Sequence, residues 1–166
     1  ATICKEETIR QQLAGINDTL NQAMNSIRES VHDLHDDAID LRQAAYEAVK
    51  DMRKNYDVHI EYDMSAHIPR NVKYCFIAIV KEGMSNIIKH SNADKVDIIF
   101  REHPGFYQLC IEDNGSVSHS VKESDHGIGI SNMRERVEAL GGTLNIRQKN
   151  GFRIFATVRK EMEETE

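Results

Sequence analysis

The feature that most constrains this chain is a run of apolar residues spaced alternately four and three apart. No Gly or Pro interrupts the run, and the spacing is typical of the seam of a coiled coil or helical bundle. A single helix cannot bury its own seam, and the chain offers no second helix of similar length. We therefore expect a missing helix upstream, a second copy of the chain, or both. The seam positions are Leu20, Met24, Ile27, Val31, Leu34, Ala38, Leu41, Ala45, Ala48 and Met52.

Size and charge narrow the class of protein. The chain has 166 residues, which suits one domain or a small domain with an extension, and its net charge of −6 argues against nucleic acid as the principal partner. Cys75 and Cys110 lie in apolar stretches, so we read them as buried thiols of a reducing, cytoplasmic compartment. No apolar run approaches the roughly 20 residues of a membrane span. Because the chain opens abruptly without Met, we expect a segment of a longer protein, with any membrane anchor outside it.

After Asn55 the apolar period changes and predicts a mixture of strands and helices. The strands and helices do not alternate regularly, so we predict an α+β fold, an α/β sandwich with helices on one face of a mixed sheet. Residues 1–55 would be the helical segment, 56–160 the sandwich and 161–166 a charged tail. The expected strands are 58–64, 95–102, 106–113, 143–148 and 152–158, and the expected helices are 72–91 and 130–140.

The first candidate site lies in KEGMSNIIKHSNA (81–93), where Glu82, Asn86 and His90 are four residues apart. A helix places such residues on one face. Glu82 and Asn86 flank the apolar stripe, and a neutral amide near a carboxylate suits hydrated Mg²⁺, which takes few direct protein ligands. A polar helix flank is the alternative.

Asp113 ends a predicted strand on the face that carries its apolar residues. An ionised carboxylate there needs a partner, and the exocyclic amine of adenine would supply one. Asn114 and Gly115 would then allow a tight turn. The alternative is that Asp113 only begins a turn.

Two glycines, Gly127 and Gly129, bracket a bend that opens the next helix, where backbone N–H groups can meet phosphate. The polar loop before them fits either a lid over a nucleotide or a surface loop. In VHDLHDDAID (31–40), His35 and Asp36 resemble a phosphoacceptor pair, but we favour a charged helix surface there.

Taken in order, KEGMSNIIKHSNA, IEDNG and HGIGISNMRERVEALGG resemble the N, first glycine and second glycine boxes of sensor histidine kinases. The resemblance is closest to the short-lid subgroup that includes nitrate and cell-envelope stress sensors, and it covers residues 57–158. It implies the Bergerat sandwich shared with gyrase B, MutL and heat-shock chaperone ATPases. It also implies ATP and Mg²⁺ as cofactors, transfer of the γ-phosphoryl to a His on a dimerisation bundle, and a response regulator as the next acceptor.

The resemblance assigns roles by position. Glu82 resembles the acidic residue that assists phosphoryl transfer, and Asn86 resembles the Mg²⁺ ligand. The residues that would contact the nucleotide are Asn86, Lys89, His90, Asp113, Gly115, Gly127, Ile128 and Gly129. The N-terminal helix resembles the second helix of the bundle, through which the chain would form a homodimer. The acceptor His would then lie upstream of this chain, and His35 would not be phosphorylated.

The chain departs from the family pattern in two places. Val117 stands where a second glycine is common in the first glycine box, and Phe152 follows Gly151 where Thr is common. Both departures leave a second hypothesis open, a non-catalytic dimerisation module built on the same fold. A gyrase-type or chaperone-type ATPase is a third hypothesis, which the long N-terminal seam and the short chain disfavour.

Overall fold

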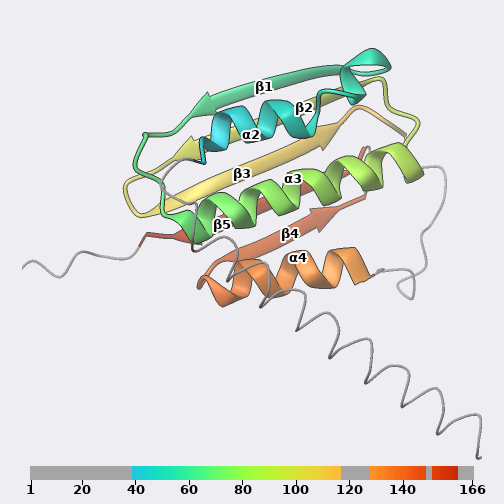
Figure 1. Ribbon diagram of the computed structural model, residues 1–166. Helices are drawn as coiled ribbons and strands as arrows, with labels where there is room; N and C mark the ends of the chain where they lie inside the picture. Colours follow the sequence, from blue (N-terminus) through green and yellow to red (C-terminus); the bar gives the residue numbers. More distant parts are fainter. Residues whose placement is uncertain (1–38, 117–127, 149–150, 161–166) are drawn as a thin grey trace, which may run out of the picture. The chain divides into compact units, whose positions relative to one another are not determined.

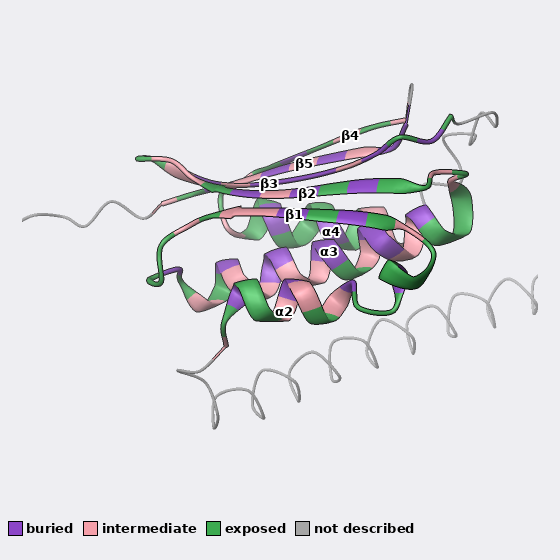
Figure 2. Ribbon diagram, turned by 90° about the horizontal axis from the view of Figure 1, so that it is seen from above, coloured by how far each residue is buried: buried purple, intermediate pink, exposed green. Residues whose placement is uncertain are grey.

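The computed structural model describes residues 39–116, 128–148 and 151–160. They form two layers, a five-stranded sheet and a layer of helices (Figure 1). Every described helix lies on the same face of the sheet (Figure 2). In chain order the elements are α2 (Leu41–Ala48), η1 (Met52–Lys54), β1 (Asp57–Asp63), α3 (Arg70–His90), β2 (Lys95–Glu102), β3 (Phe106–Asp113), α4 (Ile128–Ala139), β4 (Thr143–Arg147) and β5 (Arg153–Arg159).

The sheet is mixed, with the strand order β1-β2-β3-β5-β4. β1 and β2 run parallel and are connected through α3, whereas all other neighbouring strands are antiparallel. All five predicted strands form, and their ends lie within one residue of the predicted ends. The predicted sandwich with helices on one face of a mixed sheet is therefore confirmed.

The strands form where apolar residues alternate with polar ones, because successive side chains point to opposite faces. In β2, Val96, Ile98 and Phe100 are buried, and the residues between them are more exposed. In β3 the same alternation carries Asp113 onto the face that packs against the helices.

Helix α3 is the central element of the helical layer. Its apolar residues recur every three or four positions, and Lys89 and His90 in the last turn interact favourably with the helix dipole. Gly83 lies where α3 packs tightly on the sheet, since a Cβ there would stand 2.9 Å from Cδ1 of Ile154 and 3.1 Å from Cδ1 of Ile111. The buried residues of α3 are Val72, Cys75, Phe76, Ile79, Val80, Gly83, Met84 and Ile87.

The structure interrupts the predicted seam helix at Asp40. This residue has extended backbone angles, and its carboxylate caps α2 by accepting a hydrogen bond from the N–H of Gln43 at 3.1 Å. Helix α2 ends at Ala48, and Leu41, Ala45 and Met52 pack in the core of the sandwich. The compact unit that contains the sheet thus begins at Asp40 and not at residue 56. The seam positions before residue 39 lie outside the described residues.

We predict that a larger side chain at residue 83 destabilises the domain. Gly83→Val forces Ile111 and Ile154 to shift and should lower the free energy of unfolding by about 1–3 kcal/mol. Gly105→Val is the matched control, because a Cβ at Gly105 would have no atom within 4 Å. Urea denaturation followed by circular dichroism measures both. Equal losses in the two variants would contradict the close packing of α3 on the sheet.

A second stabilising feature is Glu102 at the end of β2. Its carboxylate accepts hydrogen bonds from Nζ of Lys160 at 2.6 Å and from the N–H of Ser65 at 2.6 Å. These two bonds hold the pKa of Glu102 well below its ordinary 4.5, at about 2. Because Ser65 follows β1 and Lys160 follows β5, the carboxylate joins three segments of the chain.

This depressed pKa predicts a pH dependence of stability. The ionised carboxylate stabilises the native state fully above about pH 4.5, and this contribution is lost as the pH falls towards about 2. Since the Glu102 side chain is 21% exposed and solvent weakens the pair, we expect Glu102→Gln to cost about 1–2 kcal/mol at neutral pH and almost nothing near pH 2. Urea denaturation at both pH values measures the difference.

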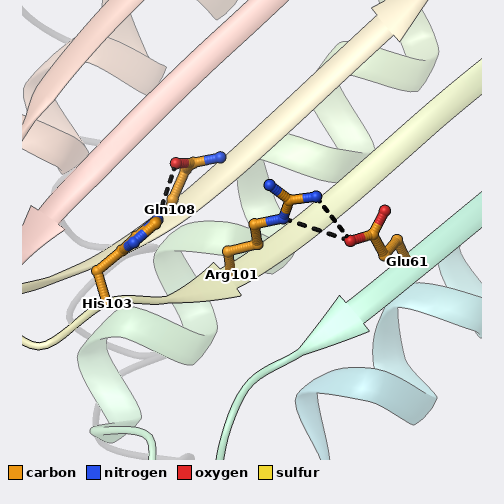
Figure 3. Close-up of polar contacts among 4 residues, drawn as sticks. All are labelled: Glu61, Arg101, His103 and Gln108. Atoms are coloured by element: carbon orange, nitrogen blue, oxygen red, sulfur yellow. Dashed lines mark hydrogen bonds and ion pairs between the residues drawn. The ribbon is translucent and has the colours of Figure 1, made fainter.

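The matched control is Glu61→Gln. Arg101 donates to Glu61 at 2.8 Å on the open side of the sheet (Figure 3), and the two side chains are 47% and 44% exposed. Solvent screens such an exposed pair, so Glu61→Gln should change the free energy of unfolding little at either pH. A Glu102→Gln variant as insensitive to pH as Glu61→Gln would show that the Glu102 contacts do not stabilise the fold.

Candidate functional site

Asp113 is the buried charged residue of the described part of the chain, with 3% of its surface exposed. Oδ1 accepts hydrogen bonds from the N–H of Gly115 at 2.7 Å and from the N–H of Phe152 at 3.3 Å. Oδ2 is also buried, and no described residue donates to it. An unpaired buried carboxylate oxygen is costly, so this atom is a ready acceptor for a donor from a ligand.

Two glycines allow the backbone to come this close to Asp113. A Cβ at Gly115 would overlap Oγ of Ser91 and lie 3.0 Å from Oδ1 of Asp113. A Cβ at Gly151 would overlap the carbonyl oxygen of Asp113, and the φ of 98° at this residue also favours glycine. Phe152 follows directly, so its N–H reaches the carboxylate although its side chain packs in the core.

Side-chain amides tie the segment after α3 to the segment after β3. Oδ1 of Asn114 accepts from the N–H groups of Asp94 at 3.1 Å and Lys95 at 3.0 Å, and Nδ2 donates to the Asp94 carboxylate at 2.7 Å. Oδ1 of Asn92 accepts from the N–H of Ser116 at 2.9 Å, and Nδ2 donates to Oγ of Ser116 at 3.2 Å. The end of α3 and the end of β3, which is Asp113, are therefore held together, and Figure 1 shows these two ends at the same end of the sandwich.

Glu82 and Gly129 meet where α3 packs against α4. A Cβ at Gly129 would overlap Oε1 of Glu82. Helix α4 can therefore start beside this carboxylate only because residue 129 has no side chain. Asn86 lies one turn further along α3 and is partly buried. Its side-chain nitrogen is buried without a hydrogen-bond partner among the described residues. The structure thus brings Glu82 and Gly129 together, and it leaves one end of the Asn86 amide available.

Three other predicted site residues are more exposed to solvent than Asp113, Glu82 and Asn86. Lys89 and His90 are exposed on the last turn of α3, and Ile128 is 80% exposed at the start of α4. Gly127 lies outside the described residues.

A hollow of about 280 Å³ lies between the end of α2, η1 and α3. Of the predicted site residues only Lys89 lines it, so this hollow is separate from the Asp113 carboxylate. The lining residues are Ala48, Asp51, Met52, Lys81, Met84, Ser85, Ile88 and Lys89.

The described residues contain no group of three or more His, Cys, Asp or Glu side chains that could hold a metal ion. The unpartnered side-chain nitrogen of Asn86 is a hydrogen-bond donor, so it suits an anionic acceptor such as a phosphate oxygen. Only the amide oxygen of Asn86 could bind an ion such as Mg²⁺, which keeps several waters and is bound mainly by substrate phosphates.

The predicted burial of Cys75 and Cys110 is confirmed. Cys75 and Cys110 are buried free thiols, and burial raises the pKa of Cys75 to about 11, so its thiol stays protonated and is no nucleophile. No helix in the described ranges is long and apolar enough to cross a membrane.

The sequence does not reveal the roles of Asn92, Asn114 and the Phe152 backbone at this site. It predicts Asn114 only as part of a turn, and Phe152 stands out only as a departure from a family pattern. The one available signal was the cluster of short polar residues in SNAD (91–94) and DNGS (113–116). Which clusters pair depends on strand order, because β2 and β3 must be neighbours before the two segments can meet.

Comparison with known proteins identifies the family. Residues 75–162 match the family described as histidine kinase-, DNA gyrase B-, and HSP90-like ATPase. The signal transduction histidine-protein kinase/phosphatase UhpB of Salmonella typhimurium is 28% identical over 92% of this chain and 30% of its own length. The sensor histidine kinase ComP of Bacillus subtilis is 26% identical over 96% of the chain and 22% of its own length. The nitrate/nitrite sensor protein NarQ of Escherichia coli is 27% identical over 87% of the chain. The chain spans less than a third of the length of each of these relatives.

Solved structures show the same fold. The histidine kinase domain of the Erythrobacter litoralis blue-light activated histidine kinase superposes with a TM-score of 0.59 at 19% identity, over 71% of this chain and 62% of that one. The catalytic domain of the histidine kinase ThkA gives a TM-score of 0.59 at 18% identity, over 74% of this chain and 93% of that domain. The family match covers more than half of the chain, and the relatives named above are sensor kinases. The chain therefore belongs to the histidine kinase-, DNA gyrase B- and HSP90-like ATPases, as a sensor histidine kinase ATPase domain.

Proposed function

We propose that this domain binds Mg-ATP beside Asp113 and the last turns of α3, and that it transfers the γ-phosphoryl group to a His on a dimerisation bundle. A response regulator would then take the phosphoryl group onto an Asp. The observation that carries the proposal is the unpaired Oδ2 of Asp113 in an otherwise satisfied, buried position.

The geometry around Asp113 suits the base of the nucleotide. Both donors to Oδ1 are backbone N–H groups, so they hold the carboxylate in one orientation with Oδ2 free. The exocyclic amine of adenine is a neutral donor that could complete this acceptor, and a hydrogen bond to a charged acceptor is among the stronger ones. Asn92 and Asn114 act as positioning residues, because they fix the segments on either side of the carboxylate.

The residues along α3 suit the phosphate end. Asn86 would contribute its amide oxygen to a Mg²⁺ ion that the phosphates and water also hold, and Lys89 and His90 would offer donors near the phosphates. Glu82 would assist proton movement at the reacting imidazole, and the N–H groups at the start of α4 would face phosphate near Gly129. Catalysis of this kind rests on positioning and charge neutralisation.

The rest of the reaction would involve segments beyond the described residues. We propose that residues 1–38 contribute a helix to a homodimeric bundle, that the acceptor His lies upstream of this chain, and that the domain works in the cytoplasm. A scaffold without phosphotransfer is the second candidate, because Val117 and Phe152 replace residues that commonly serve the nucleotide. The N–H of Phe152 partly offsets that loss by donating to Asp113.

The first test is calorimetric titration of the chain with a non-hydrolysable ATP analogue. Asp113→Asn places an amide N–H₂ against the adenine amine and should weaken binding about 10- to 100-fold, since a charged hydrogen bond is worth roughly 1.5–3 kcal/mol. Asn86→Ala should remove the strengthening of binding by Mg²⁺.

The matched control for this titration is Asp97→Asn, on the exposed opposite face of β2, which should bind like the wild type. Circular dichroism verifies folding of each variant. Unchanged affinity in folded Asp113→Asn would show that the base is not bound here. No binding by any folded variant would favour the scaffold.

The second test asks whether phosphotransfer occurs. The longer protein, with its upstream helix, should acquire acid-labile and base-stable phosphohistidine from γ-labelled ATP. Glu82→Gln should slow labelling without weakening nucleotide binding, and His35→Gln should leave it intact. Loss of the label in His35→Gln would instead identify His35 as the acceptor.

A further inference from the structure

The face of the sheet opposite the helices is uncovered by any described element (Figure 2). Ile99, Cys110 and Phe155 lie in one row across β2, β3 and β5, since the strand register pairs Ile99 with Cys110 and Cys110 with Phe155. Cys110 is only 5% exposed, and its two neighbours are partly buried, although no element lies over them. An apolar strip therefore occupies the middle of an open face, on the central strand of the sheet.

Charged residues divide this face into two halves of opposite sign. The half formed by β1 and β2 has a net charge of −2, from Asp57, Glu61, Asp63, Asp97, Lys95 and Arg101. The half formed by β3, β5 and β4 has a net charge of +2, from Glu112, Arg147, Arg153 and Arg159.

Several of these residues are already ordered by contacts within the face. Figure 3 shows Arg101 against Glu61, and Gln108 against His103. The His103 ring also stacks on the Phe106 ring, with the two centroids 4.3 Å apart. Glu112 lies 3.7 Å from both Arg147 and Arg153. Ordered side chains lose little conformational freedom when a partner binds, so the face is suited to a contact.

We propose that this open face is a contact surface between two copies of the chain, related by a two-fold axis that runs parallel to the strands and passes over β3. This rotation places β2 of one copy opposite β5 of the other. The acidic half then meets the basic half, Ile99 faces Phe155, and Asp97 faces Arg153. A second copy matches because the same face carries both signs of charge, which is the requirement of a self-complementary interface.

The size of the face indicates a weak contact. Five strands spaced about 4.8 Å apart and about 20 Å long offer roughly 400–500 Å² per copy, below the ~800 Å² of a standard stable interface. Such a contact forms appreciably only at high local concentration, for example between two domains held together by another part of the protein. The proposal is independent of nucleotide binding, because none of its residues belongs to the Asp113 site.

Crosslinking by a short bis-maleimide tests the symmetry directly, in the full chain with Cys4→Ser as background. Gln108→Cys lies on β3, next to the proposed axis, so its two copies should be close and should crosslink about fivefold faster than Asn145→Cys. Asn145 is the matched control, because the two copies of this β4 residue would be separated by about four strand spacings, or about 19 Å.

Two further variants sharpen the result. Adding Glu61→Cys to Asn145→Cys should restore crosslinking, since the axis places Glu61 of one copy opposite Asn145 of the other. Asp97→Lys, at an exposed position, should reduce crosslinking of Gln108→Cys, and adding Arg153→Glu should restore it. Crosslinking of Gln108→Cys no faster than Asn145→Cys, or unaffected by Asp97→Lys, would overturn the proposal.

Discussion

A carboxylate buried at the end of the central strand sets the requirements for the structure around it. Asp113 can be buried there only because two backbone N–H groups donate to Oδ1. One of them belongs to Phe152, so β5 must lie beside β3 and its entry must pass over Asp113, which only a glycine at residue 151 permits. The strand order of the sheet and the site are therefore parts of one arrangement.

The site contains two buried polar atoms without a hydrogen-bond partner among the described residues, and both lower the stability of the fold. A buried polar atom without a partner costs about 1–3 kcal/mol, and both Oδ2 of Asp113 and Nδ2 of Asn86 are in this condition. The packed core under α3 and the tether at Glu102 offset such losses elsewhere in the domain. A ligand that satisfies these atoms would stabilise the native state by mass action.

Local patterns in the sequence predicted the elements of the sandwich because each strand and helix has its own apolar period. They also singled out Asp113, since a charge on the apolar face of a strand is visible without a structure. They could not reveal that Asn114 binds the segment 94–95 or that Gly129 faces Glu82, because these contacts depend on which elements become neighbours. The apolar seam predicted one continuous helix up to Met52, and this prediction is wrong for a related reason. Leu41, Ala45 and Met52 continue its spacing, but they pack in the core of the sandwich, and the extended backbone of Asp40 marks the change.

The place of α2 has a consequence for exchanging parts between kinases. A fusion joined at residue 56, where the sequence period changes, would leave Leu41, Ala45, Val49 and Met52 behind and expose the face of α3 that they cover. A fusion joined before Asp40 keeps this packing and the cap of α2 intact. Helix α2 must therefore be transferred together with the ATPase domain. A segment fused upstream of this domain would connect at Asp40, the residue that caps α2.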